Sequence, residues 1–470
     1  MVVALGLFAM AARNVTDPDV WWHLRTGQLI AQAHAFVHTD PYSFTHYGRP
    51  WVNHEWLSDV LIYSLFRVAG WTGLIVIFAA LTAVTFMLVF LRCGGRSYLA
   101  GFVLVLGGYV SAPSWGVRPH TTSLFIASVF LLVLDRSEQR PRLLWWTVPL
   151  TLLWVNLHAE YALGIALIAV FLLGEWLEAT LGEGGGIFEG QRLRNLALAL
   201  LGCLVVVPLN PNGFRMYAYP IDTLRSPAMQ HFIAEWSSPN FHEAKYVPFL
   251  LMLLALVFVL GRSRRKIRLR ELLLLLVTTA GALRSVRHIS VWALVAMPIL
   301  SGLIWGWRGE RGRSLVKAGT GSSRRVAFNL LVLVGVLGFA GVRVYIVAKH
   351  QSQNEAEHFP ASAVRFLAAT RPPAPIFNHY NFGGYLIWKL YPDYPVYIDG
   401  RADLYGDQFL NEFAGTYYVT DPKWGEHIQH WKIQTILLPP DSPLVAALKL
   451  SHGWTEVYAD AQAAILTRTE

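Results

Sequence analysis

Long apolar runs dominate the chain from residue 71 to residue 348. Runs of this length are what a helix needs to cross the hydrocarbon core of a bilayer. A shorter apolar segment, "MVVALGLFAMAA", precedes them and lacks the basic leader and the cleavage site of a secretory signal peptide. The pattern therefore predicts eleven transmembrane helices, the first one shortened and the others at about 71–91, 98–113, 119–135, 143–157, 161–180, 194–209, 247–261, 271–285, 289–306 and 326–348.

Two stretches depart from this pattern. Residues 14–54 form a large polar loop after the first segment, and residues 55–70 predict either an amphipathic helix at the membrane surface or an extension of the next span. After residue 349 the strand-like segments "APIFNHYNFGGYLIW", "YPVYIDGRADLYG", "IQTILLPPDSP" and "WTEVYADAQAAILTR" alternate with turn residues. The fold class predicted is thus a membrane all-α domain at 1–349, followed by a small α/β domain at 350–470.

The composition agrees with a polytopic membrane protein. Of the 470 residues 54% are hydrophobic and only 15% are charged, and the mean hydropathy is +0.39. The net charge of +9 does not indicate nucleic acid, because the basic residues fall into short blocks between apolar runs. Two cysteines, Cys93 and Cys203, predict neither a disulfide framework nor a metal site. The "NFGG" turn matches no phosphate-binding pattern, so a bound nucleotide is not expected.

The basic residues also predict the orientation of the chain. Alternate loops carry 19 and 8 Lys and Arg residues, and the richer set is cytoplasmic by the positive-inside rule. With eleven spans, the loop 14–54 and the tail 350–470 then share the extracytoplasmic side.

Polar and aromatic residues at the span ends and in the first loop gather mainly on that outer side. They are Asp17, Asp19, His23, Asn53, His54, Glu55, Trp115, Arg118, His120, Asn156, His158, Glu160, Asn210, Asn212, Glu235, Trp236, Arg284, Arg287 and His288. Ionisable groups gathered at span ends on one face are typical of a substrate path or a catalytic chamber.

Each group also has a structural interpretation. Asp19 or Asp17 is suited to cap the helix that begins with "VWWHL", although one carboxylate can cap while the other acts as a general base. Arg284 and Arg287 are expected to bind an anion, with lipid-headgroup anchoring as the alternative. "NLHAE", which contains His158 and Glu160, fits a helix cap as well as a functional role. Five tryptophans predict an interfacial belt rather than sugar stacking: Trp21, Trp22, Trp51, Trp56 and Trp115.

The architecture resembles the GT-C class of membrane glycosyltransferases, which use polyprenyl-phosphate sugars. The specific motif is confined to residues 17–57, where "DPDVWWHL", "DPYSFT" and "PWVNHEWL" are similar to segments of bacterial membrane proteins grouped with this class. The resemblance implies an enzyme of the bacterial plasma membrane whose first outer loop supplies a catalytic base, here Asp17 or Asp19. Many relatives carry adjacent Asp and Glu, whereas Pro18 intervenes here and the nearest glutamate is Glu55. The resemblance does not determine the cofactor, and a divalent cation bound by Asp17 and Asp19 is one alternative.

The function expected is therefore transfer of a sugar from a polyprenyl-phosphate donor to a lipid, glycan or protein acceptor. Asp17, Asp19 and Glu55 are the expected catalytic residues, and Arg284, Arg287 and His288 would hold the donor phosphate. The other expected substrate-binding residues are His23, His54, Arg118, His120, His158 and Glu160. A flippase for lipid-linked sugars is the alternative, and it would need ionisable groups in the middle of several spans, where this sequence has almost none. A non-catalytic envelope assembly protein is the third interpretation.

Overall fold

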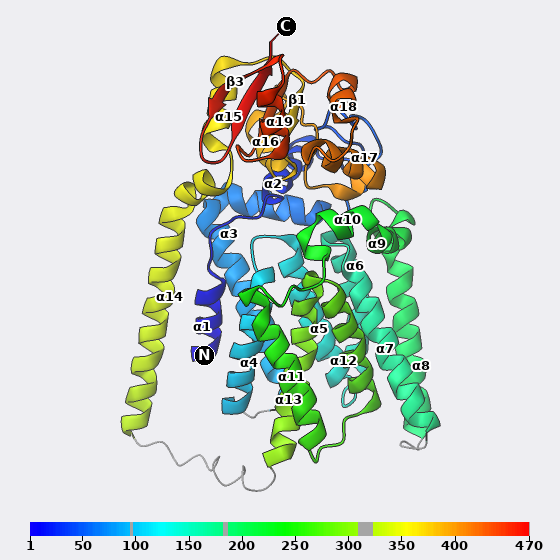
Figure 1. Cartoon of the computed structure of the whole chain (residues 1–470). Coiled ribbons are helices and arrows are strands. Elements are labelled where there is room, and N and C mark those ends of the chain that lie inside the picture. The colour runs from blue at the N-terminus through cyan, green and yellow to red at the C-terminus, as the bar shows by residue number, and fades with distance from the viewer. Residues whose placement is uncertain (95–96, 182–186, 309–322, 470) are drawn as a thin grey trace. The chain divides into compact units, whose positions relative to one another are not determined.

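The computed structural model describes residues 1–94, 97–181, 187–308 and 323–469 (Figure 1). The chain divides into two compact units. A helical unit comprises Met1–Arg13, Ile75–Tyr217 and Ala234–Val347, and a mixed unit comprises Asn14–Leu74, Ala218–Ile233 and Ala348–Glu470. Most of the basic loop 308–325, and Arg96 with it, lies outside the described residues. The domain boundary at 349/350 stays a prediction.

A helix lies at each predicted span. These helices are α1 (Val2–Ala11), α3 (Trp56–Arg92), α4 (Ser97–Ser111), α5 (Pro119–Arg136), α6 (Thr147–Leu157), α7 (Tyr161–Thr180), α8 (Ile187–Val206), α11 (Val247–Arg262), α12 (Leu269–Arg284), α13 (Ile289–Arg308) and α14 (Ser323–His358). Within the described residues, six helices are long and apolar enough to cross a membrane. An integral membrane protein is therefore indicated, while the count of eleven spans stays a prediction.

The helical unit is built around α13, which packs against α4, α11 and α12 (Figure 1). Trp292 of α13 is fully buried and meets Phe249 of α11 edge to face, with ring centroids 4.9 Å apart. Short 3-10 helices lie at the ends of the long ones: η1 (Ala112–Ser114), η2 (Pro141–Trp146), η3 (Val207–Leu209), η4 (Ala234–Trp236), η5 (Ala244–Tyr246) and η6 (Val286–His288). α9 (Arg215–Arg225) continues from the helical unit into the mixed unit.

The mixed unit holds a four-stranded sheet in the order β1-β2-β4-β3. β1 (Ile376–Asn378) is parallel to β2 (Thr435–Leu438), while β4 (Ala464–Arg468) is antiparallel to both β2 and β3 (Trp454–Ala459). The helices of this unit are α2 (Val20–Ala33), the first part of α3, α10 (Pro227–Phe232), α15 (Ala361–Thr370), α16 (Tyr380–Leu390), α17 (Ala402–Tyr417), α18 (Trp424–His430) and α19 (Pro443–Leu450). The predicted small α/β fold of the tail is confirmed.

Two local predictions for the tail are wrong. "NFGG" is not a turn but lies inside α16, because Gly383 and Gly384 let that helix approach the backbone at Ile398 and Pro18, where side chains would collide. The segment "YPVYI" is not a strand of the sheet. Instead Val396 makes an isolated bridge to Ser43 of the first loop, and its amide donates to the Tyr42 carbonyl at 3.1 Å. The tail segment therefore pairs with a segment more than 350 residues away.

The amphipathic segment at 55–70 is helical and forms the first part of α3. Gly70 separates it from the rest of α3, since its φ of 57° interrupts the helical backbone. Both interpretations of this segment thus hold in part: the helix is distinct, and it leads directly into the next span.

The interfacial belt of tryptophans is wrong for four of its five members. Trp21, Trp22, Trp51 and Trp115 are buried within the protein. Trp21 packs edge to face against Trp71 and Tyr385, with centroids 5.1 and 4.8 Å apart. These aromatic rings build the cores of the two units rather than a contact with lipid headgroups.

Candidate active site

An arginine cluster lies in the helical unit, made of Arg118, His120, His158, Glu160, Glu235 and Arg287. Nε of Arg287 donates to Glu160 at 2.8 Å, and Nδ1 of His120 lies 2.8 Å from the same carboxylate. Arg118 holds Glu235 with both terminal nitrogens, and Glu235 also lies 3.8 Å from Arg287. Two arginines thus face two glutamates, and their charges balance.

The short elements between helices position these side chains. Arg118 directly precedes α5 and His120 lies in its first turn, while His158 and Glu160 fill the connection between α6 and α7. Glu235 and Arg287 come from η4 and η6. The predicted functional residues at span ends are therefore brought together from four segments of the chain.

The ring nitrogens of His158 and His120 have different surroundings. Arg287 can only donate, so Nε2 of His158, 2.8 Å from its Nη2, accepts. Nδ1 of His158 lies 2.8 Å from Ser123 Oγ and 3.3 Å from the amide nitrogen of Glu160. Nδ1 of His120 faces a carboxylate, which leaves its Nε2 as an acceptor. Within the described part of the chain, this Nε2 and Nδ1 of His288 are buried without a hydrogen-bond partner. Such atoms would be satisfied by a ligand hydroxyl or by water.

Arg284 and Arg287 occupy different environments. Arg287 is held in the arginine cluster, and its guanidinium lies 5.5 Å from the ring centroid of Trp236. The Arg284 side chain is exposed and makes no ion pair with any described residue. Of these two arginines, Arg284 is therefore the one that offers an uncompensated charge to an incoming anion.

Electrostatics keep Glu235 ionised. Burial raises its pKa, but the charge and hydrogen bonds of Arg118 outweigh burial and lower the pKa to about 2. The carboxylate is therefore a fixed partner of Arg118 over the physiological pH range.

The predicted catalytic aspartates lie in the mixed unit, at the start of α2. Asp17 accepts the Asp19 amide hydrogen at 2.9 Å, and Asp19 accepts from the Trp22 indole at 3.1 Å. Asp19 occupies the N-cap position, but its side chain makes no capping hydrogen bond. A helix cap therefore does not explain the Asp19 carboxylate, which lies instead against Gly400, where any side chain would collide with it.

A carboxylate–histidine chain, formed by Asp59, His23, Glu55 and His54, lies in the same unit. His23 Nδ1 is 2.6 Å from Asp59 Oδ1, and its Nε2 is 3.4 Å from Glu55. The other Glu55 oxygen is 3.0 Å from His54 Nε2. Two predicted histidines and a predicted catalytic glutamate are thus joined to Asp59, which the sequence analysis missed.

A buried ion pair holds the first loop to the tail within this unit. Arg401 contacts Asp399 and Asp40 at 2.7 and 2.8 Å, and its side chain is 1% exposed. Its guanidinium also stacks on Trp51, 4.6 Å from the ring centroid. Gly400, which accommodates Asp19, lies between Asp399 and Arg401 in the sequence. The buried ion pair therefore fixes the backbone beside the candidate base.

A divalent cation needs several oxygen or nitrogen donors that converge on one point. Among the described residues, no group of three or more His, Cys, Asp or Glu side chains has that arrangement. Asp17 and Asp19 alone would supply two carboxylates to such an ion.

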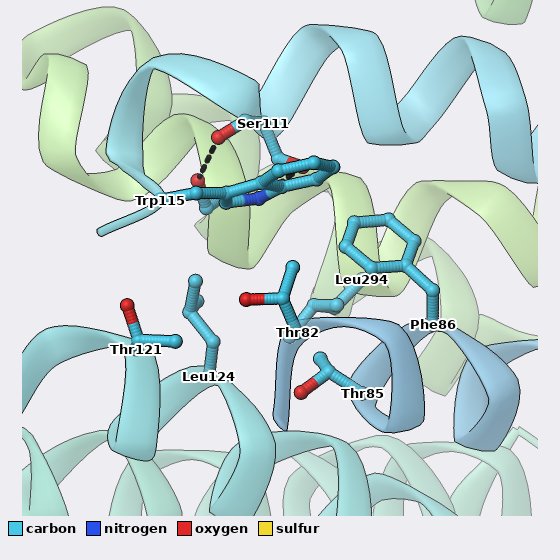
Figure 2. Close-up of a pocket in the computed structure, with 9 residues that line it drawn as sticks. Thr82, Thr85, Phe86, Ser111, Trp115, Thr121, Leu124 and Leu294 are labelled. Carbon is cyan, nitrogen blue, oxygen red and sulfur yellow. Dashed lines mark hydrogen bonds between the residues drawn. The ribbon is translucent and has the colours of Figure 1, made fainter. Parts of the chain in front are cut away.

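The helical unit also encloses a small cavity between α3, α5 and α13 (Figure 2). Its volume is about 10 Å³, and it is lined by Thr82, Thr85, Phe86, Ser111, Trp115, Thr121, Leu124, Ser290 and Leu294. That space holds at most about one water molecule. The cavity is too small for a sugar and is not the substrate site.

Comparisons with known proteins identify the fold. No protein-family model matches the chain, and no curated protein is similar to it in sequence. The oligosaccharyltransferase AglB from Archaeoglobus fulgidus, solved with an inhibitory peptide and a dolichol-phosphate, aligns over 100% of this chain and 74% of its own, with a TM-score of 0.57 and 11% identity. The apo form of an oligosaccharyltransferase from the same organism aligns over 92% and 69%, with a TM-score of 0.53 and 13% identity.

A third structure is ArnT from Cupriavidus metallidurans bound to undecaprenyl phosphate. It aligns over 99% of this chain and 97% of its own, with a TM-score of 0.51 and 14% identity. At such identities the likeness establishes a shared fold. The predicted resemblance to the GT-C class is thereby confirmed as a resemblance of fold.

Proposed function

We propose that the chain is a membrane glycosyltransferase that moves a sugar from a polyprenyl-phosphate donor to a lipid, glycan or protein hydroxyl on the extracytoplasmic face. The observation that carries this proposal is the fold, shared along nearly the whole chain with proteins solved with dolichol-phosphate and with undecaprenyl phosphate. A plasma-membrane location in a bacterium belongs to the proposal.

The reaction requires a base for the acceptor hydroxyl, and Asp17 or Asp19 supplies it. Both carboxylates are only half-buried, so an acceptor can reach them. The contact of Asp19 with Gly400 and the hydrogen bond from Trp22 restrict its rotamer, and a restricted base spends less entropy on reaching the reacting geometry.

The donor binds through its phosphate and its sugar. Arg284, Arg287 and His288 are assigned to the phosphate, with Arg284 contributing the charge that no ion pair offsets. Charge-assisted hydrogen bonds to the phosphate strengthen as it leaves with negative charge, so they lower the barrier more than they tighten binding. His120 and His158, held by Glu160, and Arg118 are assigned to the sugar, because imidazole nitrogens and paired ions suit hydroxyl groups.

The test is donor consumption by the purified protein in detergent micelles. The protein is incubated with polyprenyl-phosphate sugars and a membrane lipid and glycan extract, and mass spectrometry follows polyprenyl phosphate together with glycosylated products. Equal amounts of released polyprenyl phosphate and new glycoside support the proposal. A protein that consumes no donor in micelles, yet moves fluorescent lipid-linked sugar across proteoliposomes, is a flippase and contradicts it.

A further inference from the structure

The carboxylate–histidine chain owes its geometry to a glycine. Gly27 lies one turn after His23 on α2, so the two share a face of that helix. A side chain at Gly27 would collide with the Asp59 carbonyl, and its absence lets α2 lie directly against the first turn of α3. His23 therefore reaches the Asp59 carboxylate, which is 0% exposed and also accepts from Asn53 at 3.1 Å.

His23 is the cation of this chain. Burial lowers its pKa, but the hydrogen bond to Asp59 and the negative charges of Glu55, Asp59 and Asp19 outweigh burial and raise it to about 9. Each ring nitrogen of His23 faces a carboxylate, and burial also raises the pKa of the Asp59 carboxyl. Two further titratable groups lie near His54. Burial raises the pKa of Asp403 of α17, which interacts with the charges of His54 and Glu55, and the Tyr219 ring of α9 lies 4.4 Å from the His54 ring, centroid to centroid.

The chain ends on His54, its most exposed member. The His54 side chain is 14% exposed, against 3% for His23 and 0% for Asp59. Its Nε2 donates to Glu55, so Nδ1 is the nitrogen that can exchange a proton with a substrate. Nδ1 lies 3.4 Å from the Val52 carbonyl, a long contact that a substrate oxygen can replace.

We propose that His54 is the general acid of the glycosyl transfer and that Asp59 and His23 are positioning residues, which act on His54 through Glu55. This inference rests on the proposed function. A carboxylate that holds one nitrogen of an imidazole fixes its orientation and stabilises the imidazolium, as in Ser-His-Asp enzymes. Histidine also suits the leaving group, because its ordinary pKa of about 6.5 lies close to the second pKa of a phosphate monoester, about 6.

The proposed step moves one glycosyl group and two protons. The bond between the anomeric carbon and the phosphate oxygen breaks, and its electron pair stays on that oxygen, which takes the proton from His54 Nδ1. The acceptor oxygen forms the new bond to the anomeric carbon, and its proton passes to Asp17 or Asp19. Solvent then returns a proton from this carboxylate to His54.

The first experiment replaces His54, the last residue of the carboxylate–histidine chain. His54→Ala should lower kcat by roughly 10²–10⁴, and added imidazole should restore part of the rate. His38→Gln is the matched control, because His38 is an exposed histidine of the same loop, and it should keep the wild-type rate. A His54→Ala rate equal to that of His38→Gln, or a loss that imidazole does not rescue in a normally folded variant, overturns the assignment of the acid.

The second experiment tests the positioning residues by two readouts. In Asp59→Asn, His23 should lose its proton at a lower pH, so the alkaline limb of the kcat profile should move to lower pH by at least about one unit. Glu426→Gln is the control, because Glu426 is an exposed carboxylate elsewhere in the unit, and this variant should leave the profile unchanged. Histidine NMR of the full-length protein should show the same fall in the His23 titration. An unchanged profile, or a wild-type His23 that titrates near 6.5, overturns the chain. A wild-type protein that transfers no sugar refutes the proposed function instead. The NMR result still decides whether the carboxylate–histidine chain exists.

Discussion

Arg284 and Arg287 lie three residues apart, yet their replacement should have very different effects on stability. Arg287 donates to Glu160 at 2.8 Å and to His158 at 2.8 Å, and the two ion-pair side chains are 17% and 18% exposed. Arg287→Gln leaves Glu160 largely buried without its cation. Breaking a fully buried pair costs about 3–5 kcal/mol, and the partial exposure here lowers the expected loss to roughly 2–3 kcal/mol, in the range of charged hydrogen bonds.

Arg284→Gln is the matched control, because an exposed side chain without an ion pair should change stability by at most about 0.5 kcal/mol. Thermal unfolding in detergent should show a Tm roughly 2–3 °C lower for Arg287→Gln and an unchanged Tm for Arg284→Gln. The double variant with Glu160→Gln should lose less than the sum of the two single losses, by about 1–3 kcal/mol. Equal melting temperatures for the two arginine variants, or additive losses in the cycle, would refute the ion pair.

Three further predictions concern orientation, pH and packing. Cysteine is introduced at Ser362 or at Ser314, the latter outside the described residues, and intact cells are treated with a membrane-impermeant thiol reagent. Only the cysteine at position 362 should be labelled. Labelling at position 314 alone would reverse the predicted orientation. The pKa of folded His23, about 9, exceeds the ordinary value, so protonated His23 stabilises the fold fully below about pH 6.5. This stabilisation, up to about 3 kcal/mol, is lost as the pH rises through 9. The free energy of unfolding of His23→Gln should lack this dependence on pH, and a wild type that also lacks it would contradict a protonated His23. Gly27→Ala should destabilise the fold by about 1–3 kcal/mol through overpacking against Asp59, whereas Gly261→Ala, with open space around it, should not; equal stability of the two variants contradicts the close approach of α2 and α3.

The helices were predictable because each apolar run carries its own signal. The division of 143–180 into α6 and α7, for example, follows from the polar residues between Leu157 and Tyr161. The tail was predicted less well, because the strand-like pattern around Val396 is satisfied by the first loop rather than by the sheet. Pairing between segments so far apart in sequence leaves no local pattern.

The sequence predicted many residues of the candidate site, but not which of them contact one another. The sequence identified Arg287 and Glu160 as outer-face residues, yet 127 positions separate them, and nothing local marks them as partners. Asp59 was missed, although it had a signal: a carboxylate among the apolar residues of a helix requires a partner. Asp19 was predicted in part as a cap, and its side chain instead contacts Trp22 and the backbone at Gly400.

The central claim is that a carboxylate of the first loop performs the transfer. The most direct measurement compares the rate of sugar transfer by the wild type, Asp17→Asn and Asp19→Asn, side by side in detergent. Asparagine keeps the size of aspartate and its acceptor oxygen, so folding and the Trp22 contact should survive, while a general base is lost. One of the two variants should transfer sugar roughly 10²–10⁴ times more slowly than the wild type, at an unchanged Tm. Wild-type rates in both variants would contradict the account.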